Sequence, residues 1–471
     1  MKMINNFDTK TQEDFFRLKE DRSSRFPLGP AFLVILGVTL SGYALLGRGF
    51  AYLGVPPIFV GEVVLLLGLL TWTLTGNVRI FESRLSWLLV LLMAIGALGT
   101  GRWIGVYGMD ALRDGALWGY GLFALLVGTF LLRGRGRILT VVRVYAKWMT
   151  WFLAWIPIAM FIHLFLNHAI PRWPISNVPV LNPKGGDIAV HLAGAMAFLA
   201  LGIHRLQTIK KSGLAIRMDW LLWALLIIAS ITILTGRAAL LTIASTALLL
   251  LILRPSKHWI KPVLIGIAFI MLAIAVDAEF RADDRPRSVS PQALAQTFES
   301  IFRETGASYH DGTRQWRLEW WGDIWNYTAR GDYFWTGKGY GVNLADDDGF
   351  QVIGFNSGQP ALRSPHNSHI TFLARSGVPG FTLWIVLQLL FALSLIRAHR
   401  ESKRQGRDDF ARLNLWVLAY WLAFMVNAGF DVFLEGPQGG IWFWSLFGFG
   451  VALTLYQRQI FRKSNNLLST A

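Results

Sequence analysis

Residues 217–253, RMDWLLWALLIIASITILTGRAALLTIASTALLLLIL, decide the fold. They form two apolar runs, 217–235 and 237–253, which are separated only by the turn Thr235-Gly236-Arg237. A helix needs about 20 mostly apolar residues to cross the hydrocarbon core of a bilayer. The segment therefore predicts two membrane-spanning helices joined by a tight turn.

Similar apolar runs recur along the whole chain. Of the 471 residues, 54% are hydrophobic and only 16% are charged, which is far from the composition of a soluble domain. We therefore expect an all-α polytopic membrane protein with about twelve transmembrane helices, near 29–47, 55–75, 85–100, 110–132, 148–168, 187–205, 217–235, 237–253, 259–277, 367–396, 412–432 and 438–457.

The net charge of +16 is explained by topology. Basic residues concentrate in alternate connections, which by the positive-inside rule places both termini in the cytoplasm. The short connections on the other side carry only Arg48, Arg102, Arg172, Lys184 and Arg237. The basic face needs anionic membrane lipids as partners rather than nucleic acid, and the absence of cysteine excludes disulfides and thiolate chemistry.

These spans divide the chain into five parts. We expect a cytoplasmic arm at 1–28, nine helices in 29–277, an outer loop at 278–365, three helices in 366–457 and a cytoplasmic tail at 458–471. The outer loop is long enough to predict a function of its own. Within it, 312–329 has the pattern of an amphipathic helix whose Trp-rich stripe suits the outer membrane–water interface, the stripe being Trp316, Trp320, Ile324 and Tyr327.

His366 lies where this loop meets the next span. Imidazole titrates near neutrality and can accept the proton of a hydroxyl group, so His366 is a candidate general base. The alternative is a structural helix start, since Asn367 can cap the helix that follows. His369 is three residues further on, but the pair lacks a convincing third ligand, and we expect no metal.

Arginines on the outer side are candidate anion ligands. Arg237 in the tight turn, with Arg314 and Arg317 in the loop helix, could clamp a pyrophosphate, because a guanidinium directs paired donors at phosphate oxygens. The alternative is that they snorkel to the interface or face lipid headgroups.

Other polar residues near the outer ends of spans are weaker candidates. Charges at such positions are often structural, as are polar side chains that line an outer cavity. The weaker candidates are Arg113, Asp187 and His191, with Asp431 and Glu435 at the end of the eleventh span. The glycine-rich GKGYG at 337–341 lacks the P-loop pattern, and we expect no cofactor.

The sequence resembles the O-antigen ligase and O-antigen polymerase family of bacterial membrane glycosyltransferases. His366-Asn367, followed after nine residues by Gly377-Val378-Pro379-Gly380, is similar to a motif of the ligases, and Thr235-Gly236-Arg237 is similar to an arginine turn of the family. The loop stretch from WRLEWW to TGKGYGVNLA is also similar.

The resemblance implies a metal-independent transfer at the periplasmic face of the bacterial inner membrane. The donor would be an undecaprenyl-pyrophosphate-linked glycan, and the acceptor a glycan or a lipid A-core. His366 would match the catalytic histidine, Arg237 one pyrophosphate-binding arginine, and Arg317 or Arg314 the second. Asn367, Gly377 and Gly380 would be motif residues that shape the site.

Three functions stay open from the sequence. A glycan ligase and a polymerase that extends a lipid-linked glycan need the same donor site and differ in the acceptor. A transporter or flippase with twelve spans is the alternative of another class, and it would predict repeated halves with paired broken helices, which the sequence does not show.

Overall fold

The computed structural model describes residues 28–76, 78–134, 136–207, 213–233, 236–254, 308–351 and 362–469, together with residues 266, 280–281, 288–289 and 299. Apart from these few residues and Leu28, the expected ninth span, the N-terminal arm and the first part of the expected outer loop lie outside the described residues. The longer helices are α2 (Leu28–Leu46), α3 (Val60–Thr75), α4 (Arg84–Tyr107), α5 (Met109–Gly119), α6 (Gly121–Leu132), α7 (Arg137–Phe165), α8 (Gly185–Ala200), α9 (Gly213–Ile231), α10 (Arg237–Leu253), α13 (Ser308–Ala329), α15 (Ser368–Arg404), α16 (Asp408–Ala428) and α17 (Pro437–Ser469).

The short elements lie in the connections. The helical turns are η1 (Arg48–Tyr52), η2 (Arg79–Glu82), η3 (Asn167–Ala169), η4 (Ile203–Gln207) and α14 (Leu344–Asp347). Two antiparallel pairs, β1 (Gly54–Val55) with β2 (Ile58–Phe59) and β3 (Phe280–Arg281) with β4 (Ser288–Val289), are the strands of the described residues.

The chain is an all-α integral membrane protein, but the count of twelve spans is not confirmed. Within the described residues, six helices are long and apolar enough to cross a bilayer, or seven if the bent pair α5 and α6 forms one span. The helices α3, α8 and α10 and residues Met218–Ile231 of α9 lie in other expected spans and are apolar but shorter. Every expected span within the described residues therefore corresponds to an apolar helix or helix pair.

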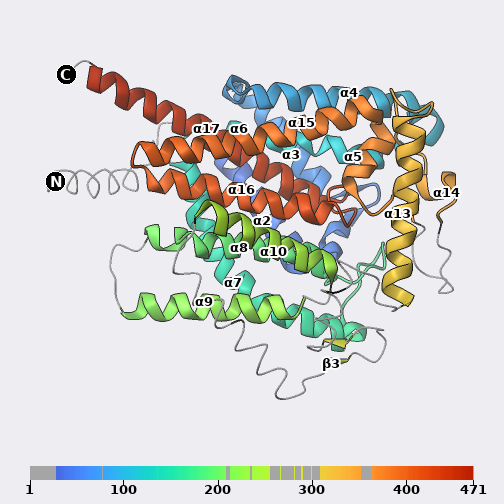
Figure 1. The fold of residues 1–471 in the computed structure, drawn as a ribbon, viewed down its shortest axis with the longest axis horizontal. Coiled ribbons are helices and arrows are strands. Elements are labelled where there is room, and N and C mark those ends of the chain that lie inside the picture. Colours follow the sequence, from blue (N-terminus) through green and yellow to red (C-terminus); the bar gives the residue numbers. More distant parts are fainter. Residues whose placement is uncertain are drawn as a thin grey trace.

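The segments that connect the helices lie at the two ends of the helix bundle. At one end the backbone N–H of Arg48 donates to Asn182 O at 3.0 Å, and the N–H of Gly341 donates to Asp114 at 2.9 Å. At the other end Arg254 pairs with Asp408 at 3.0 Å. Figure 1 shows α13 lying across the first end, nearly perpendicular to the bundle. We call these the α13 end and the opposite end.

The stripe of α13 does not face the membrane interface, contrary to our expectation. Trp320 and Ile324 are fully buried in a small core with Leu344 of α14 and Leu373 of α15. The apolar stripe of an amphipathic helix packs wherever it removes most area from water, and here α14 and α15 offer that surface. The stripe therefore fixes α13 onto the start of α15.

α15 is broken near its start. Gly377 has φ 65° and ψ −170° inside the helix, and the N–H of Val378 donates to Phe334 O at 2.8 Å. A Cβ on Gly377 would lie 2.4 Å from Phe334 O, so the close approach of the loop requires glycine. At Gly380 a Cβ would lie 2.3 Å from Ser376 Cβ. Gly377 therefore lets the loop dock into the break in α15, and Gly380 leaves room for the side chain of Ser376.

Candidate functional site

The turn before α15 presents His366 at the surface of the α13 end. His366 has φ 52°, a left-handed conformation that is uncommon for a non-glycine residue. The following residue, Asn367, caps α15 as expected, and its side chain accepts from the N–H of His369 at 3.0 Å and of Ile370 at 3.2 Å. The cap fixes the backbone, and the side chain of His366 keeps 28% of its surface exposed.

Asp431 lies behind His366. Its Oδ1 is 3.7 Å from His366 Nδ1, and its side chain is only 4% exposed. Asp431 belongs to the connection between α16 and α17, and Ser368 Oγ donates to its backbone carbonyl at 3.1 Å. This histidine–aspartate pair brings together residues from before α15 and after α16.

Two cations neutralise the buried carboxylate of Asp431. Arg48 Nη2 lies 2.7 Å from Asp431 Oδ2, and Lys184 Nζ also bonds to Oδ2. Burial raises the pKa of Asp431, but Arg48, the nearby His366 and Lys184 lower it by more, so that its pKa lies well below the usual value. Asp431 is therefore ionised throughout the neutral range.

Arg48 extends this cluster to the start of α8. Its Nε lies 3.1 Å from Asp187 Oδ2, and it therefore bridges two buried carboxylates. The result is a chain of charges from His366 through Asp431 and Arg48 to Asp187. Arg48 and Asp431 are functional candidates on which the sequence placed little or no weight.

α13 covers the His366 turn from outside. Trp321 Nε1 donates to Pro365 O at 2.8 Å, and the Trp316 ring centroid is 6.3 Å from that of His366. Arg317 donates to Phe430 O at 3.3 Å, the carbonyl of the residue before Asp431. Arg314 is half-buried and has no ion pair with the described residues.

Arg237 approaches from the α8 side. It begins α10, whose first turn packs on that of α8: a Cβ on Gly186 would lie 3.9 Å from Ala238 Cβ. Gly186 is next to Asp187, which belongs to the charge chain. The predicted arginines 237 and 317 thus come from α10, which packs on the start of α8, and from α13, which covers the His366 turn.

Three weaker candidates have structural surroundings. Both ring nitrogens of His369 are engaged, Nε2 with Met425 O at 2.9 Å and Nδ1 with Trp384 Nε1 at 3.2 Å. His191 is buried, with Nδ1 2.6 Å from Tyr420 Oη. Arg113 is mostly exposed and lies 3.7 Å from Asp110. His369 and Arg113 do not join His366.

A second charge cluster holds the loop that precedes His366. Arg363 contacts Asp114 at 3.2 Å and Asp110 at 3.3 Å, and the buried Arg375 contacts Asp114 at 2.9 Å. Arg375 also donates to Gly339 O at 3.1 Å. Asp114 therefore ties the glycine-rich stretch and the approach to His366 to α5.

Part of the chain matches a known protein family. Residues 221–385 match the family model described as O-Antigen ligase. The matched segment contains Arg237, Arg317 and His366, so the resemblance drawn from the His366 motif is confirmed. Asp431 and Arg48 lie outside it. No curated protein sequence matches the chain.

Proposed function

We propose that this membrane protein, with its O-antigen ligase segment at 221–385, transfers a glycan from undecaprenyl pyrophosphate to an acceptor hydroxyl at the α13 end. The observation that carries the proposal is His366, half-exposed in a capped turn with its Nδ1 3.7 Å from the buried Asp431. We place the α13 end at the periplasmic face and both termini in the cytoplasm of a bacterial inner membrane.

His366 is the general base in this proposal. As the acceptor oxygen forms its bond to the anomeric carbon, the bond from that carbon to the pyrophosphate oxygen breaks, and the acceptor proton moves to His366. Because Nδ1 faces Asp431, Nε2 is the nitrogen that receives the proton. The Asp431 carboxylate orients the ring and stabilises the imidazolium that forms. Attack opposite the leaving group inverts the anomeric configuration.

Arg237 and Arg317 bind the pyrophosphate. The leaving pyrophosphate gains negative charge, which guanidinium groups stabilise in a site of low water content. We prefer Arg317 to Arg314 as the second arginine, because Arg317 bonds to Phe430 O, the carbonyl of the residue before Asp431. Neither a metal nor another cofactor is needed for this charge stabilisation.

The direct test is transfer by the purified protein in nanodiscs. The donor is undecaprenyl-pyrophosphate glycan purified from the bacterium that makes this protein. Lipid A-core and a second lipid-linked glycan are offered as acceptors in separate reactions. Product formation that requires His366 supports the proposal. A protein that transfers glycan to neither acceptor, or a His366→Ala variant that transfers at the wild-type rate, contradicts it.

The choice of acceptor separates a ligase from a polymerase. We expect lipid A-core or a related hydroxyl acceptor to be used, as the family match favours ligation. Inactivation in cells then leaves long polymer on the carrier lipid, whereas loss of a polymerase leaves single repeat units.

A further inference from the structure

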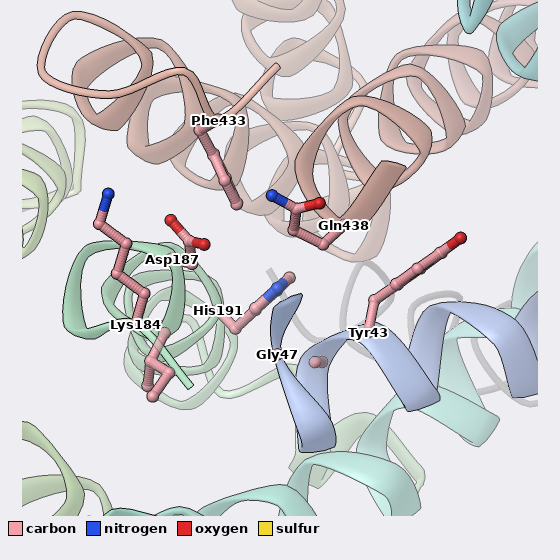
Figure 2. Close-up of a pocket in the computed structure, with 9 residues that line it drawn as sticks. Tyr43, Gly47, Lys184, Asp187, His191, Phe433 and Gln438 are labelled. Atoms are coloured by element: carbon pink, nitrogen blue, oxygen red, sulfur yellow. The ribbon is translucent and has the colours of Figure 1, made fainter. Parts of the chain in front are cut away.

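A small polar cavity adjoins the charge chain at Lys184 and Asp187. It is lined by side chains of α2, α8 and the segment that leads into α17 (Figure 2). Lys184, Asp187, His191 and Gln438 supply its polar groups, and Tyr43 and Phe433 supply aromatic ones. The enclosed space has room for one group of about the size of a water molecule.

One oxygen of Asp187 has no partner among the described residues. Asp187 is 6% exposed, and while its Oδ2 is held by Arg48, its Oδ1 is buried without a hydrogen bond. An unpaired buried acceptor destabilises a protein, and more so when it is charged. None of the described residues donates to Asp187 Oδ1, so an incoming group can supply the missing donor.

The cavity also offers donors to an incoming group. His191 Nδ1 is engaged with Tyr420, so Nε2 is the ring nitrogen that can contact a group in the cavity. Gln438 adds an amide, and Lys184 adds an ammonium group. The charges of Arg48, Lys184, Asp187 and Asp431 cancel, so a neutral group is favoured over an ion.

We propose that this cavity binds a single hydroxyl group of the sugar substrate and thereby selects for it. The hydroxyl donates to Asp187 Oδ1 and accepts from His191 Nε2 or the Gln438 amide. The inference rests on the proposed function, because Lys184 and Arg48 connect the cavity to Asp431 and the reacting centre. A buried site that pairs with a substrate hydroxyl strongly rejects an analogue without it, since its polar groups are then left unpaired.

The test uses sugars that each lack one hydroxyl. Wild-type protein is assayed with a series of monodeoxy donor glycans and a series of monodeoxy acceptors. We expect one member of one series to lose at least about 100-fold in kcat/KM, with much smaller losses for the rest. If every monodeoxy sugar reacts within about threefold of its parent, the inference is overturned and the cavity holds only water.

Variants connect this selectivity to the cavity. Gln438→Met keeps the size of the side chain but removes its polar atoms, and Asp187→Asn exchanges one acceptor for a donor. We expect the selectivity for the parent sugar to fall at least about tenfold in either variant. Gln315→Met, on the exposed face of α13, is the matched control and should keep it.

The ratio of kcat/KM for the parent sugar to kcat/KM for the deoxy sugar distinguishes a role in substrate recognition from a structural role. A purely structural role lowers the rates with parent and deoxy sugar equally, so an unchanged ratio in Gln438→Met overturns the inference even if Asp187→Asn fails to fold. If wild type transfers no glycan, the proposed function itself fails. If transfer requires His366 but shows no selectivity, only the cavity proposal fails.

Discussion

Two histidine–aspartate pairs lie at the two ends of the molecule and have different surroundings. At the opposite end, His204 Nε2 is 2.6 Å from Asp219, the histidine side chain is 11% exposed, and Arg205 also contacts Asp219. At the α13 end, His366 is 3.7 Å from Asp431 and 28% exposed.

The difference shows that a histidine next to an aspartate does not by itself indicate a catalytic site. Asp219 is shared by two neighbouring residues of η4, so this pair joins η4 to α9. Burial lowers the pKa of His204, although Asp219 raises it. Asp431 is instead neutralised from behind by Arg48 and Lys184, while the other face of His366 remains accessible to a substrate.

Removing His366 should have the largest effect. We expect His366→Ala to lower the rate of glycan transfer by about 10²–10⁴-fold, because a positioned general base contributes that much. His204→Ala should stay within a few fold of wild type. Single-turnover transfer in nanodiscs measures both rates. Equal losses in the two variants would contradict the claim that the two histidine–aspartate pairs differ in function.

Replacing Asp431 should have the next largest effect. Asp431→Asn is expected to lower kcat/KM at least about tenfold, because the imidazole loses its orienting carboxylate. Asp219→Asn should leave kcat/KM close to the wild-type value. An unchanged kcat/KM for Asp431→Asn would argue against this role.

The two ends of the molecule can also be compared through the stability of two glycine variants. Each glycine has a left-handed backbone conformation, and one lies at each end. Gly377 has φ 65°, and a Cβ there would lie 2.4 Å from Phe334 O, whereas Gly406, with φ 70°, has nothing within 4 Å of a Cβ position. Gly406→Ala should cost about 1–2 kcal/mol from the backbone alone. Gly377→Ala should cost a further 1–3 kcal/mol, approximately, from the clash. Thermal unfolding of both variants measures the difference, and equal melting temperatures would contradict the docking of the loop.

Glu435 gives the smallest expected effect. Burial raises its pKa, although Arg375 and hydrogen bonds from Thr371 and Ser364 oppose the shift. A raised pKa means that ionisation costs stability as pH rises above the unfolded value of about 4.3. The stability of Glu435→Gln relative to wild type should therefore increase as pH rises above that unfolded value. A difference that does not change with pH would refute the shifted pKa.

Features that depend on neighbouring residues could be predicted from the sequence. The apolar runs of the described residues are helices, the loop helix expected at 312–329 is α13, and Asn367 caps α15. Local hydrogen bonding and span length determine these features. The sequence also predicted that the connections between helices lie at two ends of the bundle, because every second span returns the chain to the same side.

Features that depend on distant contacts could not be predicted. Asp431 reaches His366 only because α15 and α16 form a hairpin, and Arg48 reaches Asp431 from the other end of the sequence. The stripe of α13 was placed wrongly at the lipid interface, because an amphipathic pattern identifies a buried face without identifying what covers it. The roles of His366, Arg237 and Arg317 stay predictions.

The central claim is that His366 accepts the proton of the acceptor hydroxyl, and chemical rescue tests it most directly. The single-turnover rate of transfer from undecaprenyl-pyrophosphate glycan is measured for His366→Ala with and without imidazole. We predict a rate at least about 100-fold below wild type that imidazole partly restores in proportion to its neutral form. Transfer by His366→Ala at the wild-type rate without imidazole would contradict the account.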